Sequence, residues 1–313
     1  MEEGKMEEGK PVPEIDITFR WQTQWVPIFN KQIELIQADI ERARAEDRLV
    51  VYLSCPISSR GGGYSGTNVD IARYTERRLL QEWGERFWIV NPAQYQMESK
   101  AGTGLIESHL RDLNVTAAER EAMGHPKGGD YMRMWTKVLC EDDKEDRPAK
   151  QDESLVNSGW RFDAFYFLGP TDVRHFFTQG GQQTVTAGVE AYFARRFASD
   201  PDFREAYSLD DLPWPRGTDS KLPDRAKKKP QEYWEDLRKE FFRYYAVRAS
   251  VNYSLGSHDE WNIFCLLNQR RLAATVDPGM LNGDVGMLLA GYFDGRQIDP
   301  AAMQLPTSRG YAV

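Results

Sequence analysis

The chain has 313 residues, which is long enough to bury the core of one large domain or of two modest ones. Its 41% hydrophobic and 28% charged residues are typical of a soluble globular protein. The formal net charge of -8 excludes a general electrostatic attraction to a nucleic acid duplex, and no apolar run approaches the roughly 18 residues that span a bilayer.

The N-terminal stretch, the cysteines and the histidines show no targeting or metal-binding pattern. Residues 1–20 begin with Met-Glu-Glu-Gly-Lys repeated once, which is acidic and polar, unlike a secretory signal, so we expect a disordered leader. The 3 cysteines form no CxxC pair and the 4 histidines no HExxH pattern. These patterns predict a cytoplasmic protein without a membrane partner, a metal or another cofactor.

The first regular segments predict a unit of strand, helix and strand. Residues 25–45 carry apolar positions at helical spacing and predict an amphipathic helix. Leu49–Ser54 is a short apolar run typical of a buried parallel strand, and it is followed by a glycine-rich loop. A helix over 68–85 then leads to the strand Phe87–Val90. Right-handed crossover geometry places these two strands side by side in a parallel sheet.

The middle of the chain is less regular. Helices are predicted at residues 105–113, 116–123 and 130–140, before a very polar stretch at 141–157 that is typical of an exposed insertion. Residues 162–168 form another buried strand, and residues 184–197 form a helix after a loop of glycine and glutamine.

The C-terminal third is predicted to be mainly helical. Residues 201–230 are rich in Asp, Pro and Lys and indicate a linker. Beyond it lie an aromatic helical stripe at 233–245, typical of a core or a subunit interface, and a helix over 258–272. We therefore expect an α/β domain over 21–200, with a Rossmann-like (flavodoxin-like) parallel sheet flanked by helices, and a mainly helical extension over 231–313.

Two segments bring polar and small residues to the carboxyl ends of the predicted strands, where ligands of open parallel sheets bind. The first is the loop at 55–67, in which glycines allow close backbone approach and the next helix start suits an anion. It lacks the closing Gly-Lys-Ser/Thr of a P-loop and is not GxGxxG, so a plain tight turn is the alternative. Its candidate phosphate contacts are Ser58, Ser59 and Arg60, and Gly61 is a further candidate for substrate binding.

The second segment, residues 179–194, places small and hydroxyl residues before a helix that carries one carboxylate. Glu190 lies in an otherwise apolar stretch, and Gly188 leaves room beside it for a sugar ring. Thr184 and Thr186 can bind an anion or cap the helix. The alternative is a glutamate that interacts with the helix dipole and points into water.

Two segments of the chain, residues 51–57 and residues 184–191, resemble the nucleoside 2-deoxyribosyltransferase-like family. This family includes the 2'-deoxynucleoside 5'-monophosphate N-hydrolases and the hydroxymethyl-CMP hydrolases. Residues 51–57 (Val-Tyr-Leu-Ser-Cys-Pro-Ile) are similar to the family's opening strand. Residues 184–191 (Thr-Val-Thr-Ala-Gly-Val-Glu-Ala) are similar to the segment that holds its catalytic glutamate. The strand ends Ser-Cys-Pro where the family usually has Gly-Pro, and no Gly-Thr pair precedes the glutamate.

The resemblance implies a role for each matching residue. Glu190 is the nucleophile that attacks the anomeric carbon, Thr184 contacts the phosphate, and Gly188 is the small residue beside the nucleophile. Asp130 is the second acid, although after two glycines it can equally be a helix cap. Family members typically complete their sites across subunits, so a homo-oligomer is expected.

The chemistry of base displacement can be stated independently of the family. A carboxylate must accept the sugar carbon, and the departing base must receive a proton from a group with a raised pKa. Tyr52 or Tyr64 can orient the nucleophile or stack on the base, and a core or surface tyrosine is the alternative for each. Residues 257–262 (Ser-His-Asp-Glu-Trp-Asn) are interpreted as a capped helix N-terminus, the alternative being a segment that lines the active site.

These observations predict an N-glycosidase, a hydrolase that cleaves the base–sugar bond of a nucleoside 5'-monophosphate through a glutamate nucleophile. The alternatives are a nucleoside deoxyribosyltransferase, an NAD hydrolase of the TIR-like kind, and a non-enzymatic nucleotide-binding sensor. The sequence does not distinguish the base, the sugar, or hydrolysis from transfer.

Overall fold

The chain forms two compact units. The computed structural model describes residues 17, 19–57, 63–97, 100–140, 159, 161–208, 224–247, 255–276 and 288–313. The sheet unit comprises Met1–Cys55, Glu76–Phe167 and Leu255–Val313, and the helical unit comprises Pro56–Thr75 and Leu168–Ser254. Residues 21–200, expected to form one α/β domain, are therefore divided between the two units.

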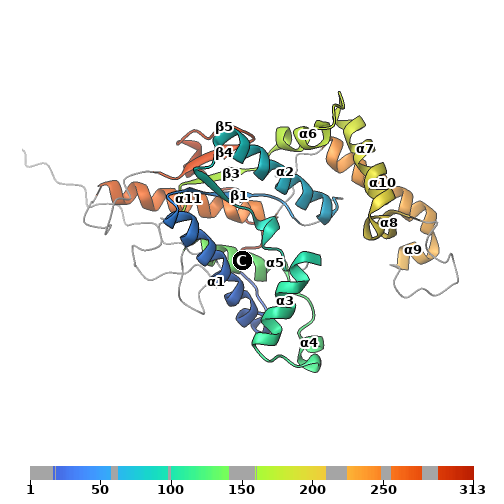
Figure 1. The fold of residues 1–313 in the computed structure, drawn as a ribbon, viewed down its shortest axis with the longest axis horizontal. Helices are drawn as coiled ribbons and strands as arrows, with labels where there is room; N and C mark the ends of the chain where they lie inside the picture. The colour runs from blue at the N-terminus through green and yellow to red at the C-terminus, as the bar shows by residue number, and fades with distance from the viewer. Residues whose placement is uncertain are drawn as a thin grey trace, which may run out of the picture. The chain divides into compact units, whose positions relative to one another are not determined.

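The sheet unit contains a mostly parallel five-stranded sheet (Figure 1). Its strands are β1 (Leu49–Ser54), β2 (Phe87–Val90), β3 (Ala164–Phe167), β4 (Ala290–Phe293) and β5 (Arg296–Gln297). The strand order is β2-β1-β3-β4-β5, in which β1 to β4 are parallel and β5 is antiparallel to β4. The predicted α/β class and the parallel pairing of the first two strands are confirmed.

β1 is central because its sequence suits burial on both faces. From Val50 onward every residue of β1 is buried, as expected for an apolar strand between two parallel neighbours. Its register aligns Leu49 with Phe87 on one side and Ser54 with Phe167 on the other. Ser54 thus ends the strand at the carboxyl edge of the sheet.

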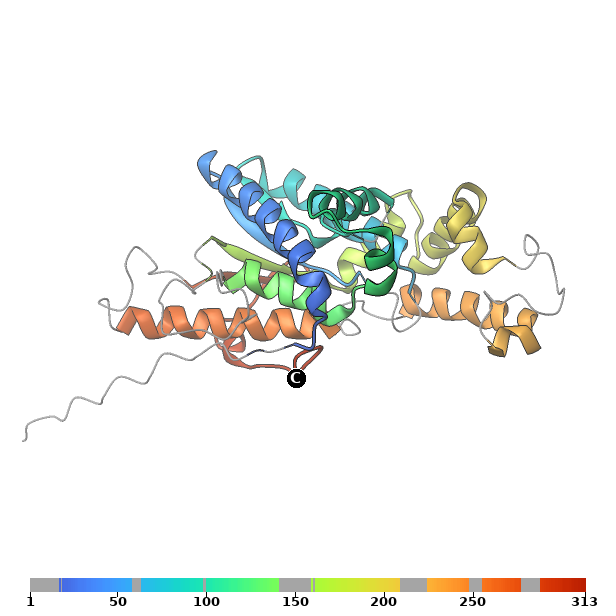
Figure 2. The same cartoon turned by 90° about the horizontal axis from the view of Figure 1, so that it is seen from below.

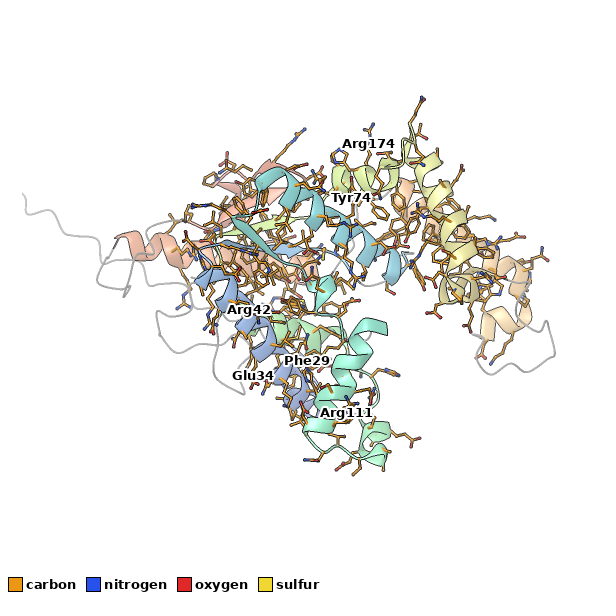
Figure 3. All side chains as sticks on the ribbon, viewed as in Figure 1. Phe29, Glu34, Arg42, Tyr74, Arg111 and Arg174 are labelled. Atoms are coloured by element: carbon orange, nitrogen blue, oxygen red, sulfur yellow. The ribbon has the colours of Figure 1, made fainter. Side chains whose placement is uncertain are left out.

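One face of the sheet is covered by α1 (Val26–Ala45), α5 (Gly128–Cys140) and α11 (Leu255–Val276), with α5 packed against both of the others (Figure 2). The Tyr52 ring lies 5.5 Å from that of Trp135 on α5, measured between centroids. On α1, Phe29 points toward α5 and meets Tyr131, whereas Glu34 lies on the exposed side (Figure 3).

The opposite face of the sheet packs on the C-terminal part of α2 (Ser65–Trp83). There the ring of Trp83 contacts Tyr166 on β3 and Tyr292 on β4. Because side chains alternate along a strand, Tyr166 faces α2 while Phe165 and Phe167 face α11. The core therefore has two layers, one on each face of the sheet.

Between β2 and β3 the structure confirms the three predicted helices. α3 (Lys100–Asp112) packs on α1, and α4 (Ala117–Met123) begins with a reciprocal cap between Thr116 and Glu119. The third helix is α5. Residues 141–157, predicted to be a polar insertion, and residues 1–16 of the predicted leader lie outside the described residues.

The predicted helical extension over 231–313 is not confirmed as a separate element. Its second helix, α11, packs on the sheet, and β4 and β5 extend the sheet at its edge. β4 reads Ala-Gly-Tyr-Phe, which is too short to show a strand pattern, and at Gly291 a side chain would collide with the ring of Phe264. The C-terminal residues then return along α11, and Ala312 bridges to Phe19.

The helical unit is built from helices that share an aromatic core. They are α6 (Pro170–Thr178), α7 (Val185–Ser199), α8 (Pro201–Tyr207), α9 (Asp224–Lys228) and α10 (Pro230–Val247), together with the start of α2. Rings of Phe193, Phe203 and Tyr207 pack around Phe241 of the predicted aromatic stripe, which is therefore core. In the same unit Tyr74 of α2 points toward Phe176 of α6 (Figure 3).

Parts of the predicted linker at 201–230 are helical. Asp200 caps α8 by accepting hydrogen bonds from the backbone N–H groups of Asp202 and Phe203, and α9 covers part of the remainder. Residues 209–223 lie outside the described residues. Throughout the part of the chain that is described, no helix has the length and apolarity needed to cross a bilayer.

Candidate functional site

The strand order reverses between β1 and β3. From β1 the chain proceeds to β2 on one side, and from β3 it proceeds to β4 on the other. In open parallel sheets ligands bind beyond the carboxyl ends of the strands at such a point. Ser54, paired in register with Phe167, is the last residue of β1 there.

A buried carboxyl group from α11 occupies this position. The Tyr52 hydroxyl donates a hydrogen bond of 2.7 Å to Glu260 Oε1, and the Ser54 hydroxyl donates one of 2.5 Å to Oε2. Tyr52 and Ser54 are two residues apart on β1, so both face α11. Glu260 is only 5% exposed and precedes Ile263 and Phe264, which pack into the core of the same face.

The surroundings of Glu260 favour its protonated form. Burial raises its pKa from 4.5 to about 7, with a further increase from the nearby charge of Asp259, while the hydrogen bonds from Ser54 and Tyr52 act in the opposite direction. A carboxyl group with this pKa gains and loses a proton near neutral pH. Strongly shifted carboxyl groups in such positions are candidates for functional sites.

The same environment keeps two neighbours protonated. Burial and the charge of Glu260 raise the pKa of Tyr52 well above 10, so it remains a phenol. Burial and the charges of Glu260 and Glu76 raise the pKa of Cys55, which therefore stays a thiol rather than a reactive thiolate. Neither group competes with Glu260 for proton exchange at neutral pH.

A second polar cluster lies at the end of β2. Cys55 Sγ is 3.8 Å from Asn91 Oδ1, and Asn91 Nδ2 donates a hydrogen bond of 2.7 Å to Glu76. Gln94, which is exposed, also donates to Glu76. The carboxyl ends of β1 and β2 thus carry carboxyl, amide, thiol and hydroxyl groups within the sheet unit.

Asp259, beside Glu260, has a structural role. Its carboxylate accepts hydrogen bonds from the backbone N–H groups of Gly310 at 2.8 Å and Tyr311 at 2.5 Å, and so holds the C-terminal segment on α11. The helix begins at Leu255, before the predicted cap at Ser257. Residues 257–262 therefore lie in the first two turns of a helix, close to the predicted helix start.

Asp130 is a buried helix cap in the sheet unit. Oδ2 accepts a hydrogen bond of 2.7 Å from the backbone N–H of Lys127, and Oδ1 accepts one of 2.6 Å from the backbone N–H of Gln22. It is 3% exposed and lies in the first turn of α5. The geometry matches the capping alternative stated above.

Glu190 lies on α7 of the helical unit with an exposed side chain. Thr184 caps this helix, its hydroxyl accepting a hydrogen bond of 3.2 Å from the backbone N–H of Ala187, while Thr186 is exposed. Gly188 is buried, and a Cβ there would collide with the carbonyl oxygen of Phe177. Gly188 therefore allows α7 to approach α6, rather than leaving space beside Glu190.

The remaining predicted site residues do not all lie in the same unit. Tyr52 orients a glutamate, namely Glu260. Tyr64 belongs to the helical unit, where its ring packs on Phe203 and its backbone N–H and C=O both bond to the Tyr245 hydroxyl. Ser58, Ser59, Arg60 and Gly61 lie outside the described residues.

The sequence pattern named Glu260 only as part of residues 257–262, for which lining the active site was the alternative interpretation. One signal was present, because a glutamate among Trp261, Ile263 and Phe264 occupies an apolar helix face and must be paired when buried. Its partners are 208 and 206 residues away, so no local pattern connects them.

Comparisons with protein-family models, curated proteins and solved structures found no match to this chain. Within the described residues, no group of three or more histidine, cysteine, aspartate or glutamate side chains is arranged to hold a metal ion.

Proposed function

We propose that this chain is an N-glycosidase that cleaves the base–sugar bond of a nucleoside 5'-monophosphate. The observation that carries the proposal is the Glu260 carboxyl group at the end of β1, where the strand order reverses. The order β2-β1-β3-β4-β5 is similar to the flavodoxin-like order, although β5 is antiparallel to β4, and nucleotide ligands of flavodoxin-like sheets bind at this point. A carboxyl group with a pKa of about 7 suits protonation of a departing base.

The nucleophile in this proposal is Glu190, by the family resemblance of residues 184–191. Its side chain is exposed and so open to a ligand. A carboxylate that attacks C1' forms a glycosyl ester, which water then hydrolyses to the sugar phosphate. Thr184, Thr186 and the loop at 55–67 are the proposed phosphate contacts.

The first experiment incubates the full chain with ribo- and 2'-deoxynucleoside 5'-monophosphates of each base and measures free base by chromatography. The variant Glu190→Gln should lower base release on the order of a thousandfold or more. Glu205→Gln is the matched control, because Glu205 is an exposed glutamate on α8 of the same unit. Unchanged release by Glu190→Gln would exclude this residue as nucleophile.

The same assay separates the alternatives. Exchange of an added free base into the nucleotide would indicate a deoxyribosyltransferase. Nicotinamide release from NAD, without base release from monophosphates, would indicate an NAD hydrolase. Binding of a nucleotide that is recovered intact would indicate a sensor.

A further inference from the structure

Three buried acidic side chains of the sheet unit, Asp130, Asp259 and Glu260, differ in the partners of their oxygens. Backbone N–H groups donate to both oxygens of Asp130 and of Asp259. The two oxygens of Glu260 instead accept from side-chain hydroxyls, those of Tyr52 and Ser54. Its hydroxyl partners distinguish Glu260 from the two aspartates.

A backbone N–H can only donate, so it favours the carboxylate form and has no place for a carboxylic proton. A hydroxyl group can donate or accept. When Glu260 is protonated, its O–H can donate to Ser54 Oγ, and the Ser54 hydroxyl proton is then free to turn toward another acceptor. The geometry around Glu260 therefore accommodates both protonation states.

The place of Ser54 gives this exchange a direction. Ser54 is the last residue of β1 and Tyr52 lies two residues before it, so Ser54 is the partner of Glu260 that is nearer to the carboxyl edge of the sheet. On the other side of Glu260, the Tyr52 hydroxyl lies deeper on the same strand, and Tyr52 is fully buried. A proton leaving Glu260 by way of Ser54 moves toward the edge where ligands of such sheets bind.

We infer that Glu260 and Ser54 form a proton relay that donates to a ring nitrogen of a nucleobase bound at the carboxyl end of β1. The identity of the acceptor rests on the proposed function, whereas the relay itself rests on the geometry of the sheet unit. Ser54 is then the residue that touches the base, and Glu260 acts through it as the proton reservoir.

In the proposed step, cleavage of the glycosidic bond and proton transfer through Ser54 occur together. The C1'–N bond breaks, and its electron pair remains on the ring nitrogen of the base. That nitrogen takes the Ser54 hydroxyl proton, Ser54 Oγ takes the Glu260 proton, and Glu260 is left as a carboxylate that accepts two hydrogen bonds. The carboxylate nucleophile bonds to C1', and the proton of the water that later hydrolyses this ester returns through Ser54 to Glu260.

The charged and titratable groups next to Glu260 lie on β1 and on α11 itself, and further cations lie on the neighbouring helix α5. β1 and the residue after it contribute Tyr52 and Cys55, both of which stay protonated. Its own helix contributes Asp259, whose charge raises the Glu260 pKa. The helix α5, which packs on α11, carries the buried cations Arg133 and Lys137.

The relay is tested first without any substrate, by infrared difference spectroscopy of the full chain between about pH 5 and about pH 9. The C=O stretch of one protonated carboxyl group should disappear with a midpoint near 7. It should be absent from Glu260→Gln and retained in Glu34→Gln, an exposed control on α1 (Figure 3). Ser54→Ala should move the midpoint upward, because the Ser54 hydrogen bond lowers the Glu260 pKa.

The amide introduced by Glu260→Gln can accept from one hydroxyl and donate to the other, so this variant should fold, and Ser54→Ala provides a second readout if it does not. A carboxyl signal that persists in Glu260→Gln, or a midpoint unchanged in Ser54→Ala, overturns the relay. These spectra do not depend on turnover, so they decide the relay even if no nucleotide is cleaved.

The second test compares leaving groups. Glu260→Gln should slow base release from a monophosphate about 100-fold or more, but should hardly slow release of nitrophenol from a deoxyribosyl 5-phosphate nitrophenyl glycoside, which needs no protonation. Equal loss on both substrates assigns Glu260 a structural role and overturns the relay. Absence of cleavage by the wild-type chain overturns the proposed function instead.

Discussion

Glu260 Oε2 accepts a hydrogen bond of 2.5 Å from the Ser54 hydroxyl, which joins the second turn of α11 to the carboxyl end of β1. Together with the bond from Tyr52, it places a buried carboxyl group at the reversal of the strand order. This arrangement should affect both the free energy of unfolding of the chain and the proton exchange of Glu260.

The stability of the folded chain should depend on pH through Glu260. The Glu260 pKa is about 7 in the folded chain and near 4.5 when unfolded, so its contribution is fully present below pH 4.5 and is lost as pH rises through 7. Between about pH 4.5 and about pH 7 the free energy of unfolding of the wild type, relative to Glu260→Gln, should fall by about 3 kcal/mol. Denaturant unfolding of both proteins across this range measures it. If the free energies of unfolding of the two proteins changed in parallel with pH, the result would contradict the pKa assigned to Glu260.

Replacing Tyr52 with Phe removes one donor to the buried carboxyl group. Because the Tyr52 hydrogen bond lowers the Glu260 pKa, Tyr52→Phe should raise the titration midpoint. It should also reduce the free energy of unfolding at neutral pH by about 1–2 kcal/mol. Tyr74→Phe, in the helical unit, controls for loss of a phenol hydroxyl. If the Glu260 titration midpoint were the same in Tyr52→Phe and in the wild type, the Tyr52 hydrogen bond would not affect the Glu260 pKa.

Gly310→Ala tests how Asp259 holds the C-terminal segment. A Cβ at Gly310 would collide with the carbonyl oxygen of Leu255, so the segment must move and the bonds to Asp259 must lengthen. We expect a loss of about 1–3 kcal/mol in the free energy of unfolding and faster proteolysis of the C-terminus. Gly84→Ala controls for strain alone, since Gly84 has a φ of +90° and open space around it. A smaller effect at Gly310 than at Gly84 would contradict the packing described.

Thr184→Ala tests the cap of α7. Loss of the hydrogen bond to the Ala187 N–H should destabilise the helical unit by about 1 kcal/mol, and Thr184→Ser should restore most of it. Thermal unfolding followed by circular dichroism measures both. If Thr184 also contacts the phosphate, Thr184→Ala should raise the KM for a monophosphate more than for the corresponding nucleoside. An equal change for both substrates would leave the residue with its capping role alone.

The sequence pattern predicted the elements that carry strong local signals. Leu49–Ser54 was recognised as a buried strand because its apolar run is bounded by turn residues, and α1 and α5 because their apolar positions recur at helical spacing. α6 was not predicted, although the proline at position 170 suits the first turn of a helix. β4 has too few residues to show a period.

The site was harder to predict than the strands because its members meet only through tertiary packing. Tyr52 was selected as a residue that orients a nucleophile, and the structure pairs it with a glutamate 208 residues away. Local spacing indicated a capped helix start at Ser257, whereas α11 begins at Leu255 and buries Glu260. Which carboxyl group meets which hydroxyl depends on how α11 packs on β1, and a single sequence does not encode that pairing locally.

The proposed mechanism can be tested most directly by trapping the glycosyl ester. A 2'-deoxy-2'-fluoro nucleoside 5'-monophosphate should form the ester but hydrolyse slowly, because fluorine destabilises the positive charge that develops at C1'. Trypsin releases residues 175–195, in which Glu190 is the only carboxyl side chain, and residues 249–270, which contain Asp259 and Glu260. We predict that mass spectrometry finds the fluoro-sugar phosphate on peptide 175–195. An adduct on peptide 249–270, or none on either peptide with any of the bases, would contradict Glu190 as the nucleophile.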